Sequence, residues 1–248
     1  MSDQDQTIVE LRRVRYEIGG YTILDGVDLR IRKGEILILL GESGCGKTTT
    51  LKLINRLIEP TSGQVIVEGR SAAEWDPIEL RRHIGYVLQE SGLFPHFTVA
   101  ENVGLVLKLK GWNEDSLRYR SREMLELVGL DPERFENRFP HELSGGQRQR
   151  VGVGRAFASD PSIVLLDEPF GALDAITRRN LQKEFARIVR ELGKTAIFVT
   201  HDLHEAMSLG TRIALMDKGR IVLLDTPESF RRSDVPLARA YLETVLPA

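Results

Sequence analysis

The chain contains the eight-residue run Gly41-Glu42-Ser43-Gly44-Cys45-Gly46-Lys47-Thr48, which indicates its fold. It matches the P-loop pattern G-x-x-x-x-G-K-[ST], in which glycines let backbone N–H groups close around phosphate oxygens. Lys47 would then reach the β- and γ-phosphates of a nucleotide, and Thr48 would hold Mg²⁺. The alternative is a glycine-rich turn without a ligand.

The residues on both sides of this run predict the strand and the helix that a P-loop requires. Residues 35–40 are nearly all apolar and are bounded by glycines, which predicts a strand buried on both faces of a parallel sheet. Residues 48–58 have apolar side chains at helical spacing. This context favours a phosphate-binding loop over a plain turn.

The rest of the chain predicts an α/β fold. Residues 7–17 and 21–32 are rich in Val, Ile, Leu and Tyr, and apolar and polar residues alternate strictly at 27–31, which predicts half-buried strands. Residues 93–155 look like a helical insertion. The other elements that we expect are a strand at 65–68, helices at 116–128 and 148–158, a strand at 163–166, a helix at 177–192, a strand at 196–200 and a hairpin of 212–216 with 221–224. Strands that alternate with helices in this way are typical of α/β proteins.

Two carboxylates follow the buried strand expected at 163–166. Asp167 is our candidate for the acid that holds Mg²⁺ beside the phosphates. Glu168 is well placed to polarise a water that attacks the γ-phosphate, as a general base or water-orienting group. Two acids after a strand are by themselves more often a solvated strand end, but a P-loop in the same chain favours the functional interpretation.

A second glycine-rich segment, Leu143-Ser144-Gly145-Gly146-Gln147, precedes the helix expected at 148–158. Its hydroxyl and amide groups would form another anion site at a helix N-terminus. One nucleotide scarcely needs two such sites about 100 residues apart, so we expect the second to serve a nucleotide held by another copy of the chain. The alternative is an ordinary serine N-cap.

The composition excludes several function classes. The 248 residues carry 34 Lys and Arg against 36 Asp and Glu, a net charge of −2, which argues against a nucleic-acid partner. No apolar run approaches the roughly 18 residues of a membrane-spanning helix, and no secretory signal is visible, so we expect a cytoplasmic protein. The single cysteine, Cys45, excludes an intrachain disulfide and a thiolate metal cluster, and we interpret it as filler.

Together these motifs resemble the ATP-binding subunit of an ABC transporter, over nearly the whole chain. Five motifs occur in that family's order: Gly41–Thr48 as Walker A, Gln89 as the Q-loop glutamine, Leu143–Gln147 as the signature, Ile163–Glu168 as Walker B and His201 as the switch histidine. Leu173-Asp174 resembles the D-loop.

The resemblance implies a site for ATP and Mg²⁺. It implies that Lys47, Gln89, Glu168 and His201 act in hydrolysis, and that Thr48, Gln89 and Asp167 hold the metal ion. The nucleotide-binding residues that it implies are Gly41, Glu42, Ser43, Gly44, Cys45, Gly46, Lys47, Thr48, Thr49, Ser144, Gly145, Gly146, Gln147 and Asp174. A lone histidine after a strand is usually structural, but His201 precedes Asp202-x-x-Glu205, which predicts a capping box at a helix start.

Adenine stacking is the point where the chain departs from the family pattern. The family usually places an aromatic residue near the second strand, and an ungapped comparison puts Ile18 there, with Tyr16 and Tyr21 nearby. We expect Tyr16 to stack on adenine because it shares strand parity with position 18. The alternative is that Tyr16 is merely a strand residue.

The resemblance implies an α/β P-loop NTPase of the ABC type, with a parallel core sheet, an N-terminal antiparallel β part and a helical subdomain inserted between Walker A and Walker B. Within a single ABC ATPase domain at 1–248, we expect the β part at about 7–35 and the RecA-like core at about 36–92 and 156–225. The helical subdomain would occupy about 93–155 and a short C-terminal helical tail about 226–248.

The function that the resemblance implies is that of a transport motor. Two copies would form an ATP-dependent homodimer and drive polytopic membrane permease subunits, with an extracytoplasmic substrate-binding protein as an indirect partner. The chain would be peripheral, on the cytoplasmic face of the cell membrane, and the apolar loop 92–98 would dock a permease helix unless its side chains are buried. A soluble ABC ATPase of repair, translation or cluster assembly is the alternative.

The cargo follows from a closer resemblance. The stretches 92–98, 138–143 and 170–178 are similar to ATPases of osmoprotectant importers, which carry glycine betaine, choline or carnitine. Lipid and amino-acid importers are the nearest alternatives. The chain ends at Ala248 without the paired regulatory domains of many such ATPases, so we expect no osmotic control through such a module.

Overall fold

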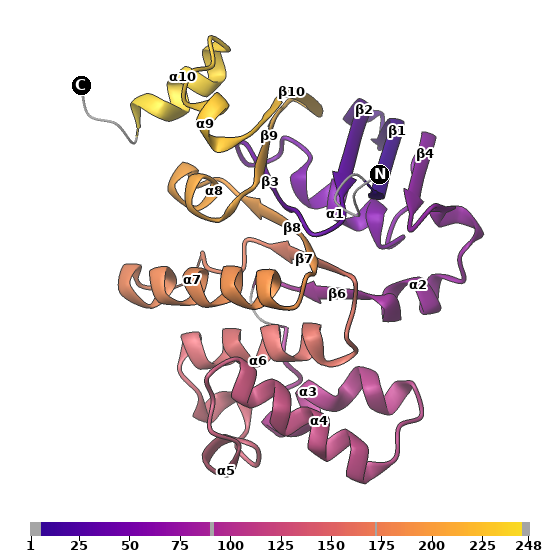
Figure 1. Cartoon of the computed structure of the whole chain (residues 1–248). Coiled ribbons are helices and arrows are strands. Elements are labelled where there is room, and N and C mark those ends of the chain that lie inside the picture. Colours follow the sequence, from indigo (N-terminus) through magenta and orange to yellow (C-terminus); the bar gives the residue numbers. More distant parts are fainter. Residues whose placement is uncertain (1–5, 90–91, 172, 245–248) are drawn as a thin grey trace. The chain divides into compact units, whose positions relative to one another are not determined.

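The computed structural model describes residues 6–89, 92–171 and 173–244 (Figure 1). They group into two compact units, one with the residues up to Arg81 and from Lys194 onward, and one that runs Arg82–Gly193. Each unit contains strands and helices. The finer division into β part, core, helical subdomain and tail stays a prediction.

An antiparallel sheet in the first unit contains the N-terminal strands. Its members are β1 (Thr7–Ile18), β2 (Tyr21–Arg32), β4 (Ser62–Val67) and β5 (Arg70–Ser71), in the order β2-β1-β4-β5. On β2 the buried side chains alternate from Val27 to Ile31, whereas Ile8 to Leu11 on β1 are all buried. Both strands were predicted correctly, to within one residue, although the alternation holds only on β2.

A second group of strands in the first unit runs β10-β9-β3-β8. Its members are β3 (Ile36–Leu40), β8 (Thr195–Thr200), β9 (Arg212–Asp217) and β10 (Arg220–Asp225). β3 is buried along its whole length and is parallel to both β8 and β9. β9 and β10 form the predicted hairpin, whose turn residues Lys218 and Gly219 both have positive φ.

The helices of this unit are short. They are α1 (Lys47–Ile54), α8 (Leu203–Leu209), α9 (Pro227–Phe230) and α10 (Pro236–Glu243), and α2 (Pro77–His83) contains the boundary between the units. α1 ends four residues before the expected position 58. The Asn55 side chain accepts the Leu57 N–H at 3.2 Å and Arg56 has a left-handed φ of 52°, so local turn geometry ends the helix where apolar spacing did not predict it.

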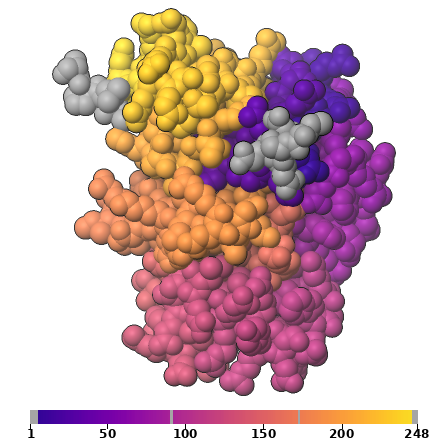
Figure 2. Space-filling model, viewed as in Figure 1, coloured from indigo at the N-terminus to yellow at the C-terminus, as the bar shows by residue number. Residues whose placement is uncertain are grey.

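The second unit combines a parallel strand pair with helices. β6 (Ile84–Val87) pairs with β7 (Ile163–Asp167). Its helices are α3 (Val99–Leu109), α4 (Glu114–Leu127), α5 (Pro132–Phe135), α6 (Gly145–Ala158) and α7 (Ala175–Glu191). α3, α4 and α6 pack against one another, and in the space-filling view the magenta and pink side chains of this segment form a continuous surface (Figure 2). A helical insertion is therefore present, as predicted.

The longest described helix, α7, has 17 residues and a mostly polar surface. Among the described residues, none of the helices has both the length and the apolar character needed to cross a membrane.

Candidate nucleotide-binding site

The P-loop connects β3 to α1, and it leaves the first turn of α1 without a side-chain cap. The N-cap is Gly46 in a left-handed conformation, and it has no side chain with which to cap the helix. Gly44 also has a left-handed φ of 83°. Uncapped backbone N–H groups in a glycine loop at a helix start are the donors that bind phosphate.

Neighbouring backbone fixes the shape of this loop. A Cβ atom on Gly46 would lie 2.5 Å from Leu24 Cδ2, and one on Gly41 would lie 2.4 Å from the carbonyl oxygen of Met216. The carbonyl of Cys45 accepts the N–H of Gly219 at 3.1 Å. The loop is therefore held against β2 and the β9–β10 hairpin, which gives a preorganised binding surface.

Lys47 is the charged group of the loop. It is only 4% exposed, and its ammonium donates to the carbonyl oxygens of Gly41 at 2.7 Å and Glu42 at 2.8 Å. No carboxylate of the described residues pairs with it. A buried charge needs a counter-charge, which a phosphate would supply, so the residues present fit a nucleotide.

The Cys45 side chain, in contrast, has a packing role. It is buried, and burial raises the pKa of its thiol, so the side chain is a neutral group beneath the loop. This agrees with its interpretation as filler.

Asp167 lies at the carboxyl end of β7 in the second unit. Tyr86 on β6 is paired with Leu165, and its hydroxyl forms a hydrogen bond with the Asp167 carboxylate. Burial and this carboxylate raise the pKa of Tyr86, so the phenol keeps its proton and donates it. A carboxylate held in this way suits Mg²⁺, which prefers oxygen ligands, so Asp167 fits a metal-binding role.

Glu168, the next residue, has a strained backbone. Its φ of 43° is left-handed, a conformation that costs a residue with a Cβ about 1 to 2 kcal/mol. The side chain is half-buried. Strain of this kind concentrates at active sites, which supports a functional interpretation of Glu168.

The signature segment starts α6, and here the sequence prediction was wrong about the helix start. α6 begins at Gly145 rather than at 148, because Ser144 and Gln147 form a capping box. Ser144 Oγ accepts the Gln147 N–H at 3.3 Å, and Gln147 Oε1 accepts the Ser144 N–H at 2.9 Å. The two glycines therefore lie inside the first turn of the helix.

Gln89 and Asp174 are exposed in the same unit. Asp174 is the N-cap of α7, and the N–H groups of Thr177 and Ile176, each at 3.1 Å, lower the pKa of its carboxyl. Ala172, in the third stretch that indicates an osmoprotectant cargo, lies outside the described residues.

His201 follows β8 and is exposed. Asp202 caps α8, as expected, by accepting the His204 N–H at 2.7 Å. The reciprocal half of the expected capping box was wrong, because the Glu205 carboxylate instead accepts the Thr200 hydroxyl at 2.5 Å. The Thr200 oxygen in turn accepts the Asp202 N–H at 3.0 Å, so the backbone at His201 is held from both sides.

Tyr16 lies half-buried on β1, opposite Leu24, the residue whose side chain contacts Gly46. Ile18 and Tyr21 are paired with each other nearer the hairpin end and are both exposed. Tyr16 is thus the member of this group that is nearest in register to the P-loop contact.

Strand register brings the predicted residues together in two groups. In the first unit, Leu40 is paired with Thr200, so the P-loop and His201 leave neighbouring parallel strands at the same edge. In the second unit, Val87 is paired with Leu166 on the neighbouring parallel strand. Gln89 and the carboxylates Asp167 and Glu168 therefore also follow neighbouring strands at the same edge. Ligands of open α/β sheets bind at this edge.

The sequence did not reveal Tyr86 as a partner of Asp167. The signal was present, because Tyr86 carries a hydroxyl in an otherwise apolar strand. The partner lies on a strand far along the chain, so only the register identifies it.

A glycine loop between a buried parallel strand and an uncapped helix defines a nucleotide-binding protein of the P-loop class. The chain belongs to the ABC transporter family, whose model matches residues 24–171.

Relatives and solved structures agree with this assignment. The glycine betaine/carnitine/choline transport ATP-binding protein OpuCA of Bacillus subtilis is 53% identical over 87% of this chain and 56% of its own length. The glycine betaine uptake system ATP-binding protein YehX of Escherichia coli is 44% identical over 89% of this chain and 71% of its own. A dimeric ATP-binding cassette in a post-hydrolysis state, bound to ADP and Pi, superposes with a TM-score of 0.79 at 37% identity, over 89% of this chain and 99% of that one.

The chain spans about half the length of several curated relatives that it matches, 56% in the case of OpuCA. The fold expectation is confirmed by the solved cassettes.

Proposed function

We propose that the chain is the ATP-binding and ATP-hydrolysing motor subunit of an ABC importer. The observation that carries this proposal is the P-loop, in which a buried Lys47 ammonium and an uncapped helix start converge on one place. The Lys47 contacts with Gly41 and Glu42 would be exchanged for stronger, charge-assisted hydrogen bonds to the β- and γ-phosphates.

The chemistry would be hydrolysis by an attacking water. Glu168 would accept the proton of that water, and His201 would contact the γ-phosphate. Thr48, Gln89 and Asp167 would hold Mg²⁺, which neutralises phosphate charge when bound. Tyr86 would keep the Asp167 carboxylate oriented through its hydrogen bond.

The signature segment would act on a nucleotide held by a second copy of the chain, in an ATP-dependent homodimer. The solved relative is a dimer with ADP and Pi, which supports this arrangement. In the single chain, Ser144 and Gln147 satisfy each other. The capping hydrogen bond to the Ser144 oxygen is long at 3.3 Å, so this hydroxyl could turn toward a phosphate at small cost.

The loop at 92–98 supports a membrane partner, because its apolar side chains are displayed on a rigid frame. Phe94 is 42% exposed. The buried Asn102 amide donates to the carbonyl oxygens of Phe94, Phe97 and Thr98 at 3.0 to 3.1 Å. We propose that this surface docks a cytoplasmic helix of a polytopic permease, which would make the chain a peripheral subunit of the membrane.

The cargo that we propose is a quaternary-ammonium osmoprotectant, delivered by an extracytoplasmic binding protein. The names of the relatives support this choice over lipid and amino-acid importers and over a soluble ATPase. The transported molecule would not touch this chain, so the argument rests on likeness of sequence.

Reconstitution tests the proposal. The full-length protein, its permease and its binding protein are placed in liposomes, and ATP-dependent uptake of labelled glycine betaine and choline is compared with that of an amino acid and a phospholipid. We expect uptake of the quaternary ammonium compounds alone, and none with the Lys47→Ala variant. If the quaternary ammonium compounds neither enter the liposomes nor stimulate ATP hydrolysis, the cargo proposal is wrong. If ATP is hydrolysed but none of the tested compounds enters the liposomes, the chain is not an importer motor.

A further inference from the structure

A hollow on the antiparallel sheet has no role in the site described above. It has a volume of about 820 Å³ and is lined by residues of β1 and β2, with one residue from β9 and one from β10. It therefore lies wholly within the first unit. None of the candidate nucleotide-site residues lines it. A hollow of this volume is large enough to hold a small molecule.

The lining of this hollow is basic. Two of its residues are acids, Glu10 and Asp28. Its other charged residues are the five arginines Arg12, Arg13, Arg30, Arg32 and Arg212. The chain as a whole has a net charge of −2, so the local excess of arginine does not follow from the composition. A concentration of positive charge in a hollow attracts anions.

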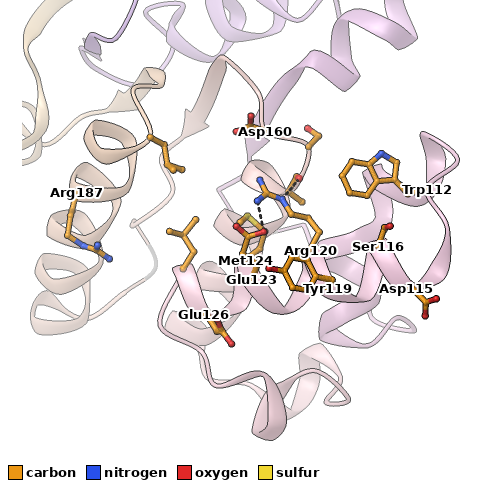
Figure 3. A pocket seen from close by; sticks show the side chains of 14 residues that line it. Trp112, Asp115, Ser116, Tyr119, Arg120, Glu123, Met124, Glu126, Asp160 and Arg187 are labelled. Carbon is orange, nitrogen blue, oxygen red and sulfur yellow. Dashed lines mark hydrogen bonds and ion pairs between the residues drawn. The ribbon is translucent and has the colours of Figure 1, made fainter.

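A hollow in the second unit, beside α4, has the opposite charge (Figure 3). Its volume is similar, about 980 Å³, but four carboxylates and two arginines line it, among them Glu126 and Arg187. A basic lining is therefore not a general property of the hollows on this chain. Arg187 also offers a control position, because it lines a hollow that should repel anions.

Two of the five guanidinium groups are held in place by a buried acid. Glu10 is only 8% exposed, and its carboxylate accepts from Arg12 at 2.7 Å and from Arg30 at 2.8 Å. These hydrogen bonds, from Arg12 first and then from Arg30, lower the pKa of Glu10 to about 2. The acid therefore stays ionised at neutral pH and orients two cations with a single negative charge.

A third guanidinium is fixed from β9. Arg212 donates to the carbonyl oxygen of Arg30 at 3.2 Å and to the carboxylate of Glu35 at 3.3 Å. Its side chain is 18% exposed. Three of the arginines are thus positioned before any ligand binds, which lowers the entropic cost of binding.

Arg13 and Arg32 differ from these three. Both residues are exposed, and neither guanidinium forms an ion pair with another described residue. The backbone N–H of Arg13 donates to Asp28 Oδ1 at 2.9 Å, so this acid is held by the main chain of β1 rather than by an arginine side chain. An anion can therefore bind Arg13 and Arg32 without first breaking an ion pair.

The composition of the lining indicates the kind of anion. A guanidinium binds phosphate through two parallel N–H···O bonds, which an ammonium cannot form. The described residues that line the hollow include neither a lysine nor an aromatic side chain. Buried aromatic anchors usually dominate the energy of a protein interface. The lining therefore favours a compact anion with several phosphate groups over an acidic segment of a protein.

The hollow is separate from the P-loop, although β2 contributes to both. Leu24, on β2, lies against Gly46 of the P-loop. Arg30 lies six residues further along the same strand, about 20 Å away at the rise of a β-strand. A phosphate bound by Lys47 is therefore out of reach of the arginines of the hollow.

We propose that this hollow binds a small, soluble molecule with several phosphate groups, at a site distinct from the P-loop. A lipid headgroup offers the same phosphate chemistry, and the experiment below distinguishes the two sources. The proposal does not rest on the proposed function, because it needs neither ATP hydrolysis nor a membrane partner.

Inorganic tripolyphosphate is the probe, and isothermal titration calorimetry of the full chain without Mg²⁺ measures its binding. The Lys47→Ala variant serves as the background, because its P-loop should bind phosphate weakly. We expect one saturable site in this variant, weakened about tenfold or more when Arg13→Gln and Arg32→Gln are added together. Both arginines are exposed and outside ion pairs, so we expect these changes to leave the fold intact.

Two further variants provide the controls. Arg187→Gln removes the same charge from the hollow beside α4 and should leave the affinity for tripolyphosphate unchanged. Arg32→Lys keeps the charge but not the paired donors, so it should weaken binding less than Arg32→Gln does. No saturable binding in the Lys47→Ala background would overturn the proposal. Equal losses from Arg32→Gln and Arg187→Gln would also overturn it.

Vesicles and an acidic peptide test the other occupants. Sedimentation with vesicles of phosphatidylglycerol and phosphatidylcholine should be the same for the unmodified chain and for the Arg13→Gln, Arg32→Gln double variant. A peptide of glutamates should bind more weakly than tripolyphosphate. Vesicle binding that needs the two arginines, without saturable binding of tripolyphosphate, would overturn the proposal of a soluble ligand. Tighter binding of the peptide would do the same. A chain that does not hydrolyse ATP would contradict only the proposed function.

Discussion

α1 and α6 both begin at a glycine-rich segment, but their first turns are satisfied differently. At α1 the N-cap is Gly46, which has no side chain to cap the helix. At α6 the side chains of Ser144 and Gln147 cap each other's backbone. Of these two helices only α6 has a side-chain cap at its start, so the start of α1 is the one that an anion would complete.

This difference indicates a division of labour between the two segments. The P-loop has a buried cation and a helix start without a side-chain cap, so it should bind nucleotide in a single chain. The signature helix is stable without a ligand, so it should contribute only when a second chain brings a nucleotide to it.

Glu168→Gln should give the largest effect. The amide keeps the shape of the side chain but cannot accept a proton, so hydrolysis should fall by about 100- to 10,000-fold while ATP binding remains. ATP should then hold two chains together, with the signature of one on the nucleotide of the other. Phosphate release measures hydrolysis, and light scattering measures the association of the two chains. Glu228→Gln is the matched control. Near-normal turnover of Glu168→Gln would show that Glu168 does not have its proposed role.

Lys47→Ala should weaken nucleotide binding by about 10- to 100-fold, because it removes hydrogen bonds from a charged group to phosphate. Titration of a fluorescent nucleotide into the single chain measures the affinity. Lys52→Ala, in the last turn of the same helix, removes an equal charge and should have little effect. Equal affinities for the two variants would contradict the assignment of the P-loop.

Ser144→Ala should leave the nucleotide affinity of the single chain unchanged and lower the free energy of unfolding by about 1 kcal/mol, the cost of a lost N-cap. Ser144→Gly should cost only a few tenths as much, since glycine is tolerated at this position. Urea unfolding and nucleotide titration provide the two measurements. If Ser144→Ala weakened binding as strongly as Lys47→Ala, the two helix starts would be equivalent and the comparison would fail.

Tyr16→Ala should have the smallest effect, a loss of about three- to tenfold in ATP affinity, because one aromatic contact is worth about 1 kcal/mol. Binding of inorganic tripolyphosphate, which has no base, should not change. Tyr21→Ala is the matched control at the exposed hairpin end. The same loss in both variants, or a loss of tripolyphosphate binding, would mean that Tyr16 does not contact adenine.

Sequence predicted the elements whose signals are local. β3 and the P-loop have a continuous apolar run and fixed glycines, so their identity did not depend on distant residues. The end of α1 at Asn55 and the start of α6 at Ser144 were missed because side-chain bonds to nearby backbone decide them, not apolar spacing.

Contacts between distant segments could not be predicted in the same way. The bond from Tyr86 to Asp167 depends on the register of β6 with β7, and Glu205 satisfies Thr200 instead of completing a capping box. Strained backbone, such as the left-handed φ of Glu168, also depends on surroundings that a sequence pattern does not contain.

The P-loop of one chain and the signature of another should form one working site, and a mixture of two inactive variants tests this arrangement. Lys47→Ala lacks a functional P-loop and Ser144→Arg lacks a functional signature, so each should be inactive alone. A mixed dimer would contain one site with an intact P-loop and an intact signature. We predict that phosphate release returns on mixing, up to the rate of one working site per dimer. No recovery at any mixing ratio, with mixed dimers shown to form, would contradict the composite site.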